Sequence, residues 1–174
     1  MEKVIALTLL VSLLPTAQRN SNPRDLRISV SVVEGEHSRD SNSSATTITI
    51  KDNDMVYDRS YAGYGARKRK AAHQEIKLTG QELDQLRQLI SKESLLVSRS
   101  TQLPTHSAGR YVIVIMNLKV GKRKSAIKVS GMTNRIENET LYKRAKALID
   151  EIDRIRVGHG ASILSTDLPQ LHDG

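Results

Sequence analysis

The stretch YVIVIMNLKVGKRKSAIKV, residues 111–129, decides the fold class, because its apolar residues recur at every second position. A period of two residues is typical of a β-strand with one buried face. Five apolar residues share one face of the first predicted strand: Val112, Val114, Met116, Leu118 and Val120. Gly121 and Lys122 can form a two-residue turn, since glycine suits its first central position. Ile127 and Val129 then return inward, so the stretch predicts an antiparallel hairpin.

The opposite face of the first strand is also apolar over its first half, where it carries Tyr111, Ile113 and Ile115. A strand with two apolar faces is typical of the centre of a sheet. The alternative is that the second face contacts another element or a second subunit.

The same two-residue period appears in the first third of the chain. Leu26, Ile28, Val30 and Val32 alternate with polar residues and predict a strand. Segments 46–51 and 55–61 predict a hairpin, because Asp52-Asn53-Asp54 between them supplies turn-forming side chains. The hydrophilic segment 34–44 is expected to be a loop.

Two segments predict amphipathic helices. In 78–90, Thr79 and Glu82 have the spacing of a capping box, and Leu83, Leu86 and Ile90 form an apolar stripe. In 138–157, Asn138 is the expected N-cap and Gly158 the expected end. Its predicted stripe consists of Leu141, Ala145, Leu148, Ile152 and Ile155. The fold class is therefore α+β: a single antiparallel sheet of about four to five strands with two amphipathic helices packed on one face.

The N-terminus predicts secretion. Residues 4–14 are an apolar run of eleven, too short for a membrane span, which needs about 20, and Ala17 is a candidate cleavage position. We expect a signal peptide at 1–17, a linker at 18–24, one domain at 25–157 and a mobile C-terminal tail at 158–174. The localisation is then secreted or periplasmic; the alternative is a buried N-terminal helix or strand.

Motif searches favour a non-enzymatic protein. The chain has no cysteine, which excludes thiol nucleophiles and disulfides, and its five histidines show no metal-ligand spacing. No G-x-S-x-G sequence occurs, and GYGARK (63–68) lacks the third glycine of a dinucleotide loop. We therefore expect no catalytic residue, cofactor or metal.

Basic charge is the remaining signal, since the net charge is +8. Two clusters are candidates for anion binding: Arg67, Lys68, Arg69 and Lys70, and then Lys122, Arg123 and Lys124. If both lie on one face, their summed field attracts a polyanion. An anionic envelope polymer or an acidic protein is the expected partner, because secretion argues against nucleic acid. The alternative is a solubilising surface, the usual role of charge runs.

Two sequences, IKLTGQELDQLRQLI (76–90) and IKVSGMTNRIENETLYKRAKALIDEI (127–152), resemble small uncharacterised secreted bacterial domains in which strands pair with a capped helix. The resemblance covers 26–157 and implies no activity. The layout is also similar to that of small secreted α+β protease inhibitors. We therefore expect a secreted or periplasmic interaction domain that binds an anionic partner through its basic loop and hairpin. The alternative is an inhibitor of a secreted hydrolase, which would insert the loop at 34–44 or 61–72.

Overall fold

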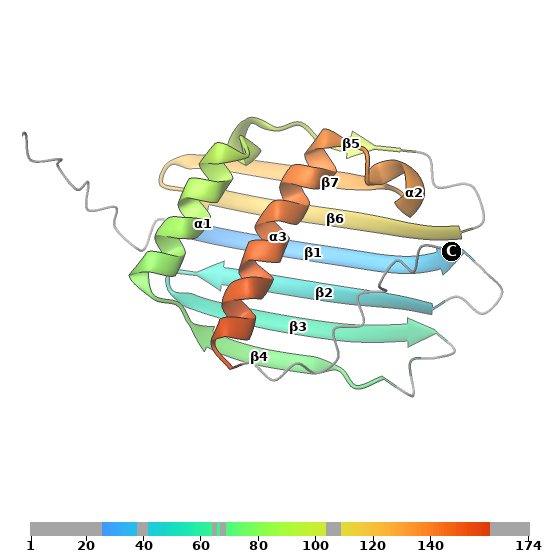
Figure 1. Cartoon of the computed structure of the whole chain (residues 1–174), viewed down its shortest axis with the longest axis horizontal. Helices are drawn as coiled ribbons and strands as arrows, with labels where there is room; N and C mark the ends of the chain where they lie inside the picture. The colour runs from blue at the N-terminus through green and yellow to red at the C-terminus, as the bar shows by residue number, and fades with distance from the viewer. Residues whose placement is uncertain (1–25, 38–41, 64–65, 67–68, 104–108, 161–174) are drawn as a thin grey trace, which may run out of the picture.

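Seven strands form one sheet in the order β4-β3-β2-β1-β6-β7-β5 (Figure 1). The computed structural model describes residues 26–37, 42–63, 66, 69–103 and 109–160. The strands are β1 (Leu26–His37), β2 (Asn42–Lys51), β3 (Asp54–Gly63), β4 (Ala72–Lys77), β5 (Thr101–Gln102), β6 (Gly109–Val120) and β7 (Arg123–Met132). The helices are α1 (Gly80–Lys92), the short 3-10 helix η3 (Leu95–Val97), α2 (Thr133–Ile136) and α3 (Thr140–Gly158).

The predicted α+β class and the single sheet are confirmed, but the predicted number of four to five strands is too low. Every neighbouring pair is antiparallel except β5 and β7, which makes the sheet mixed. The two missed strands are β4 and β5. β4 contains only Ile76 as a large apolar residue, and β5 has two residues, so neither has a hydrophobic period long enough to read.

The expected loop at 34–44 is wrong at both of its ends. β1 continues to His37 and β2 begins at Asn42, with Gly35 paired to Ser43. The polar segment stays extended because its backbone also pairs with β6. In that pairing Gly35 lies opposite Tyr111. A Cβ atom at Gly35 would lie 2.5 Å from the Tyr111 hydroxyl oxygen, so only glycine fits beneath this ring.

Helices α1 and α3 lie across one face of the sheet (Figure 1) and cover the aliphatic core between the two layers. The predicted stripe residues Leu83, Leu86 and Ile90 of α1 are all buried. So are the five predicted for α3: Leu141, Ala145, Leu148, Ile152 and Ile155. Burying each leucine or isoleucine among them contributes about 1.5–3 kcal/mol to folding, so these stripes fix the helices on the sheet.

The predicted N-terminal cap is confirmed in α1, whereas the ends of α3 differ from the prediction. The capping box is present in α1, where the Thr79 hydroxyl accepts from the Glu82 N–H and Glu82 accepts from the Thr79 N–H. In α3 the N-cap is Glu139, without a side-chain hydrogen bond, because the preceding turn after α2 shifts the start by one residue from Asn138. Gly158 is the last residue of α3, and His159 is the C-cap.

Strand β6 lies between β1 and β7, as the two apolar faces of 111–115 predicted. Its second face points away from the two helices. There Ile115 is 41% exposed, while Tyr111 and Ile113 are half-buried. The hairpin turns at Asp52 and Gly121 have positive φ angles of 59° at both residues, as expected for tight two-residue turns. The predicted signal peptide (1–17), linker (18–24) and all of the tail after residue 160 lie outside the described residues.

Candidate functional site: a charged pocket beside helix α3

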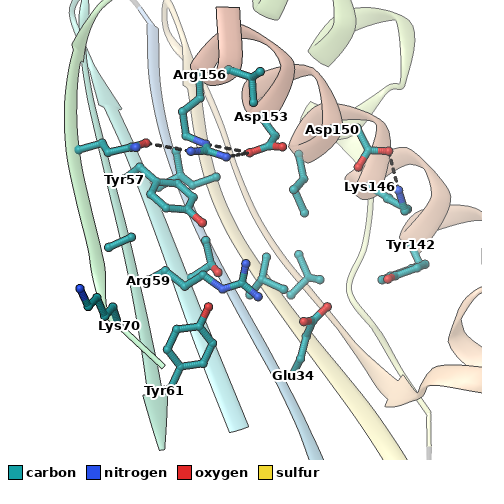
Figure 2. Close-up of a pocket in the computed structure, with 18 residues that line it drawn as sticks. Glu34, Tyr57, Arg59, Tyr61, Lys70, Tyr142, Lys146, Asp150, Asp153 and Arg156 are labelled. Carbon is teal, nitrogen blue, oxygen red and sulfur yellow. Dashed lines mark hydrogen bonds and ion pairs between the residues drawn. The ribbon is translucent and has the colours of Figure 1, made fainter. Parts of the chain in front are cut away.

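A pocket of about 150 Å³ lies between α3 and the helix-facing side of strands β1–β4 (Figure 2). Helix α1 packs against one side of α3, and the pocket lies along the opposite side, over strands β1–β4, which α2 does not cover (Figure 1). Its apolar lining comes from both layers and consists of Val32, Ile48, Ala72, Val114, Ile149 and Val157. Charged and aromatic side chains complete the wall.

The strand pattern explains why charges enter this pocket. Along β3, the helix-facing positions change from Met55 and Tyr57, which are buried, to Arg59 and Tyr61, which are half-buried. On β1 the same change occurs from Val30 to Glu34. The inward face of the sheet therefore becomes polar at the end where the helices no longer cover it.

Arg156 closes one end of the pocket and is held by three partners. Its Nε donates to Asp153 Oδ1 at 2.8 Å, and its Nη1 donates to Gln74 Oε1 at 2.9 Å. The guanidinium carbon also lies 4.6 Å from the centroid of the Tyr57 ring, within the range of a cation–π contact. Arg156 is only 8% exposed, so these contacts compensate for the removal of its charge from water, and its role here is structural.

Lys146 and Asp150 form an ion pair with an Nζ–Oδ2 distance of 2.6 Å. Both side chains are more than half exposed, at 53% and 54%, so the pair adds little to stability. It does neutralise the charge that α3 presents at the middle of the pocket.

Arg59 differs from the other cations of the pocket. Its Nε atom is buried and has no hydrogen-bond partner, and Arg59 makes no ion pair with any described residue. Its guanidinium carbon lies 5.3 Å from the centroid of the Tyr61 ring. In Figure 2 the guanidinium group points into the space between Tyr57 and Glu34. A buried donor without an acceptor is rare in folded proteins and calls for an explanation.

The wall of the pocket also contains a carboxylate, Glu34, and a tyrosine hydroxyl, Tyr142. Glu34 lines the pocket from β1 and makes no ion pair with the described part of the chain. Tyr142 lines it from α3, and burial raises the pKa of its hydroxyl, with smaller contributions from the negative charges of Glu34, Glu137 and Asp150. The Tyr142 hydroxyl is therefore protonated at neutral pH and faces the field of the Glu34 carboxylate.

The structure separates the two basic clusters that the sequence predicts. Arg69 and Lys70 follow β3, near its last residue Gly63, whereas 122–124 form and follow the β6–β7 turn. Arg67 and Lys68 lie outside the described residues. Lys70 lines the pocket, and the Arg69 guanidinium carbon lies 5.4 Å from the centroid of the Tyr61 ring. Tyr61 thus has two guanidinium groups near its ring.

The strand register measures this separation. Gly63 pairs with Asn42, at the end of the sheet where Gly35 pairs with Tyr111. The β6–β7 turn follows Val120, which pairs with Leu26 at the other end. Residues 111–120 of β6 span on the order of 30 Å at roughly 3.3 Å per residue. Figure 1 shows the end of β3 and the β6–β7 turn at opposite ends of the sheet, so Arg69 and Lys70 do not share a patch with Lys122, Arg123 and Lys124.

The sequence interpretation missed Arg59, Tyr61, Glu34 and Tyr142 as pocket residues. A signal existed on β3, where Tyr57, Arg59 and Tyr61 alternate in phase with buried Met55. A cation in the inward phase of a strand is unusual unless it is paired or serves a site. Glu34 gave no such signal, because the hydrophilic segment that follows it predicted a loop.

Other classes of site find no support in the described residues. Within the ranges that the structure describes, no three His, Asp or Glu side chains are grouped so that they could hold a metal ion. The helices described are also not long and apolar enough to cross a membrane. A comparison with known protein families and with curated proteins found no match. The roles of the pocket residues therefore follow from their geometry alone.

Proposed function

We propose that the protein is a non-enzymatic binding domain that holds an anionic ligand in the pocket beside α3, with Arg59 as the anchoring cation. The observation that carries this proposal is the buried Nε of Arg59, which has no acceptor. That atom is itself closed to solvent, so a ligand carboxylate or phosphate would accept from the Nη groups of the same guanidinium group, which make no ion pair with a described residue. A charge-assisted bond from a guanidinium group is among the stronger hydrogen bonds in proteins. The secreted or periplasmic location stays a prediction from residues 1–17.

The charge balance of the pocket supports an anion. Four cations line it (Arg59, Lys70, Lys146 and Arg156), against three carboxylates (Glu34, Asp150 and Asp153), so the net charge is 4 − 3 = +1. Lys146 and Arg156 are paired with Asp150 and Asp153. Removing these two pairs leaves two cations and one carboxylate, which still favours a ligand with negative charge.

The separation of the basic clusters favours a small ligand over a polymer. A polyanion would gain most from both clusters acting together, and a distance on the order of 30 Å prevents this for a short segment. The 150 Å³ pocket instead matches a compact group, since a cavity of similar size can hold a single aromatic ring. No observation among the described residues favours the alternative of hydrolase inhibition.

Isothermal titration with matched charge variants tests the proposal. The purified protein is titrated with a set of small carboxylates and phosphate monoesters, and with the corresponding neutral alcohols. We expect anions to bind, the alcohols not to bind, and Arg59→Gln to weaken the affinity by about tenfold or more. The control is a triple substitution of Lys122, Arg123 and Lys124 to Gln, which should leave the affinity unchanged. Loss of binding in the triple variant with retention in Arg59→Gln would refute the assignment.

A further inference from the structure

Glu34 is the unpaired carboxylate of the pocket. Once the pairs Lys146–Asp150 and Arg156–Asp153 are set aside, only Arg59, Lys70 and Glu34 remain without an ion pair among the described lining residues. Lys70 is exposed at the rim, whereas Glu34 and Arg59 are half-buried. The interior of the pocket therefore presents one unpaired carboxylate as well as one unpaired guanidinium group.

The sheet register sets the separation of the two backbones that carry these groups. Glu34 pairs with Ser44 on β2, and Ser44 pairs with Tyr61 on β3, two residues beyond Arg59. Two strand spacings separate the backbones of β1 and β3, which is about 10 Å. In Figure 2 both side chains extend toward the same space, yet no ion pair joins them, so their charged atoms are more than 4.0 Å apart.

A small molecule that carries both charges fits this gap. The carboxylate and ammonium groups of an α-amino acid are separated by one carbon atom, so they can face two opposite charges that are too far apart to contact each other. A carboxylate such as Glu34 accepts hydrogen bonds and donates none at neutral pH. It therefore selects against a second anionic group and favours an ammonium group.

The remaining wall of the pocket is apolar. Val32 and Ile48 come from the sheet, and Ile149 and Val157 come from α3 on the opposite side. An aliphatic or aromatic side chain buried here gains about 25 cal/mol for each Å² removed from water. The whole pocket, including the end that holds the charged groups, has a volume of about 150 Å³, so the side chain of the ligand is no larger than one aromatic ring or a short branched chain.

We infer that the ligand is a small zwitterion with an apolar side chain, of the class of the apolar α-amino acids. Its carboxylate binds Arg59, its ammonium group binds Glu34, and its side chain lies between α3 and the sheet. The inference rests on the proposed anion-binding function of the pocket and adds Glu34 as the residue that determines specificity.

Two matched sets of probes test this assignment by isothermal titration of the purified protein. The first set is phenylalanine, 3-phenylpropionate and phenethylamine; the second is leucine, 4-methylpentanoate and isopentylamine. Each set keeps the apolar group and removes one charge at a time. We expect an amino acid to bind about tenfold or more tightly than the matching acid, and the amines not to bind.

The variant Glu34→Gln separates the two proposals. It should remove the preference for the amino acid over the acid while leaving the affinity for the acid unchanged or higher. An unchanged preference in Glu34→Gln, or an acid that binds the wild type as tightly as its amino acid, would overturn the role of Glu34 and leave anion binding at Arg59 in place. Failure of all six probes would overturn the zwitterion, and failure of the wider anion set as well would overturn the proposed function. Wild-type melting temperature in Glu34→Gln establishes that the variant is folded.

Discussion

The guanidinium carbon of Arg156 lies 4.6 Å from the centroid of the Tyr57 ring, so the last turn of α3 is attached to strand β3. The two residues are 99 positions apart in the chain, and no local pattern links them. Asp153 and Gln74 fix the same guanidinium group by hydrogen bonds. This contact sets the separation of α3 from the sheet at one end of the pocket, and hence the width of the pocket.

Arg156→Ala should destabilise the protein by about 2–3 kcal/mol. The substitution leaves Asp153 and Gln74 without their partner and removes the cation–π contact. Asp153 is 35% exposed, so water can solvate its carboxylate once Arg156 is removed. The expected loss of stability is therefore smaller than for a fully buried ion pair. Urea unfolding measures it. Arg154→Ala is the matched control, because Arg154 forms an i,i+3 pair with Glu151 but is 63% exposed, and it should cost less than about 1 kcal/mol. Equal losses in the two variants would contradict a special role for Arg156.

Leu86→Ala and Ile152→Ala should each lower the free energy of unfolding by about 2–5 kcal/mol, because both side chains are fully buried between the helices and the sheet. Val97→Ala is the control, since Val97 is 68% exposed and should change stability by less than about 0.5 kcal/mol. Chemical denaturation gives all three values. Losses below about 1 kcal/mol at Leu86 or Ile152 would show that the helix faces are assigned incorrectly.

The sequence could predict which residues of the helices and of β6 are buried in the core. The period of 3.6 residues identified every buried aliphatic position of α3, and the period of two identified the helix-facing side of β6, because each pattern is local. Strand β4 could not be predicted, since it is held by pairing with β3 and carries one large apolar residue. The pocket could not be predicted either. It joins residues of β1, β3 and α3, and only the strand order and the position of α3 bring Glu34, Arg59 and Tyr142 together.

Thr79→Ala should cost about 1 kcal/mol of stability, because it removes the hydroxyl that accepts from the Glu82 N–H in the first turn of α1. Thr79→Ser keeps this acceptor and should cost only a few tenths of a kcal/mol. Thermal unfolding of the two variants side by side checks the difference. If alanine and serine behaved alike, the capping hydrogen bond would contribute nothing.

The capping box also predicts how stability depends on acid pH. Burial raises the pKa of Glu82, but hydrogen bonds from the Thr79 N–H and hydroxyl and from His159 outweigh it and hold the pKa below its ordinary value of 4.5. A lowered pKa in the folded state stabilises the protein above the unfolded pKa, and the gain is lost as the pH falls through the folded value. The stability difference between wild type and Glu82→Gln should therefore be constant near neutral pH and shrink below about pH 4.5. A difference that did not change with pH would exclude the linkage.

His73 should titrate above its ordinary pKa of 6.5, because hydrogen bonds to Asp58 and then Glu75 favour the protonated ring. The His73 Nδ1 lies 2.6 Å from Asp58 Oδ1 on the neighbouring strand. A raised pKa in the folded state means that the stabilisation is present below the unfolded pKa and is lost as the pH rises through the folded value. Titration of the imidazole by NMR gives this pKa directly, and Asp58→Asn should lower it. Glu36→Gln, a change on the distant strand β1, should not move it.

The central claim is that ligand binding occurs in the pocket beside α3, with Arg59 as its anchor. Backbone amide shifts in two-dimensional NMR, recorded while phenylalanine or an anionic probe is added, test it most directly. We predict that the largest shifts fall on Glu34, Arg59 and Tyr61 and on residues 142–157 of α3, with little change at 121–124, and that Arg59→Gln moves the midpoint of these shifts to a ligand concentration about tenfold or more higher. Shifts confined to the β6–β7 turn, or an unchanged response in Arg59→Gln, would contradict the account.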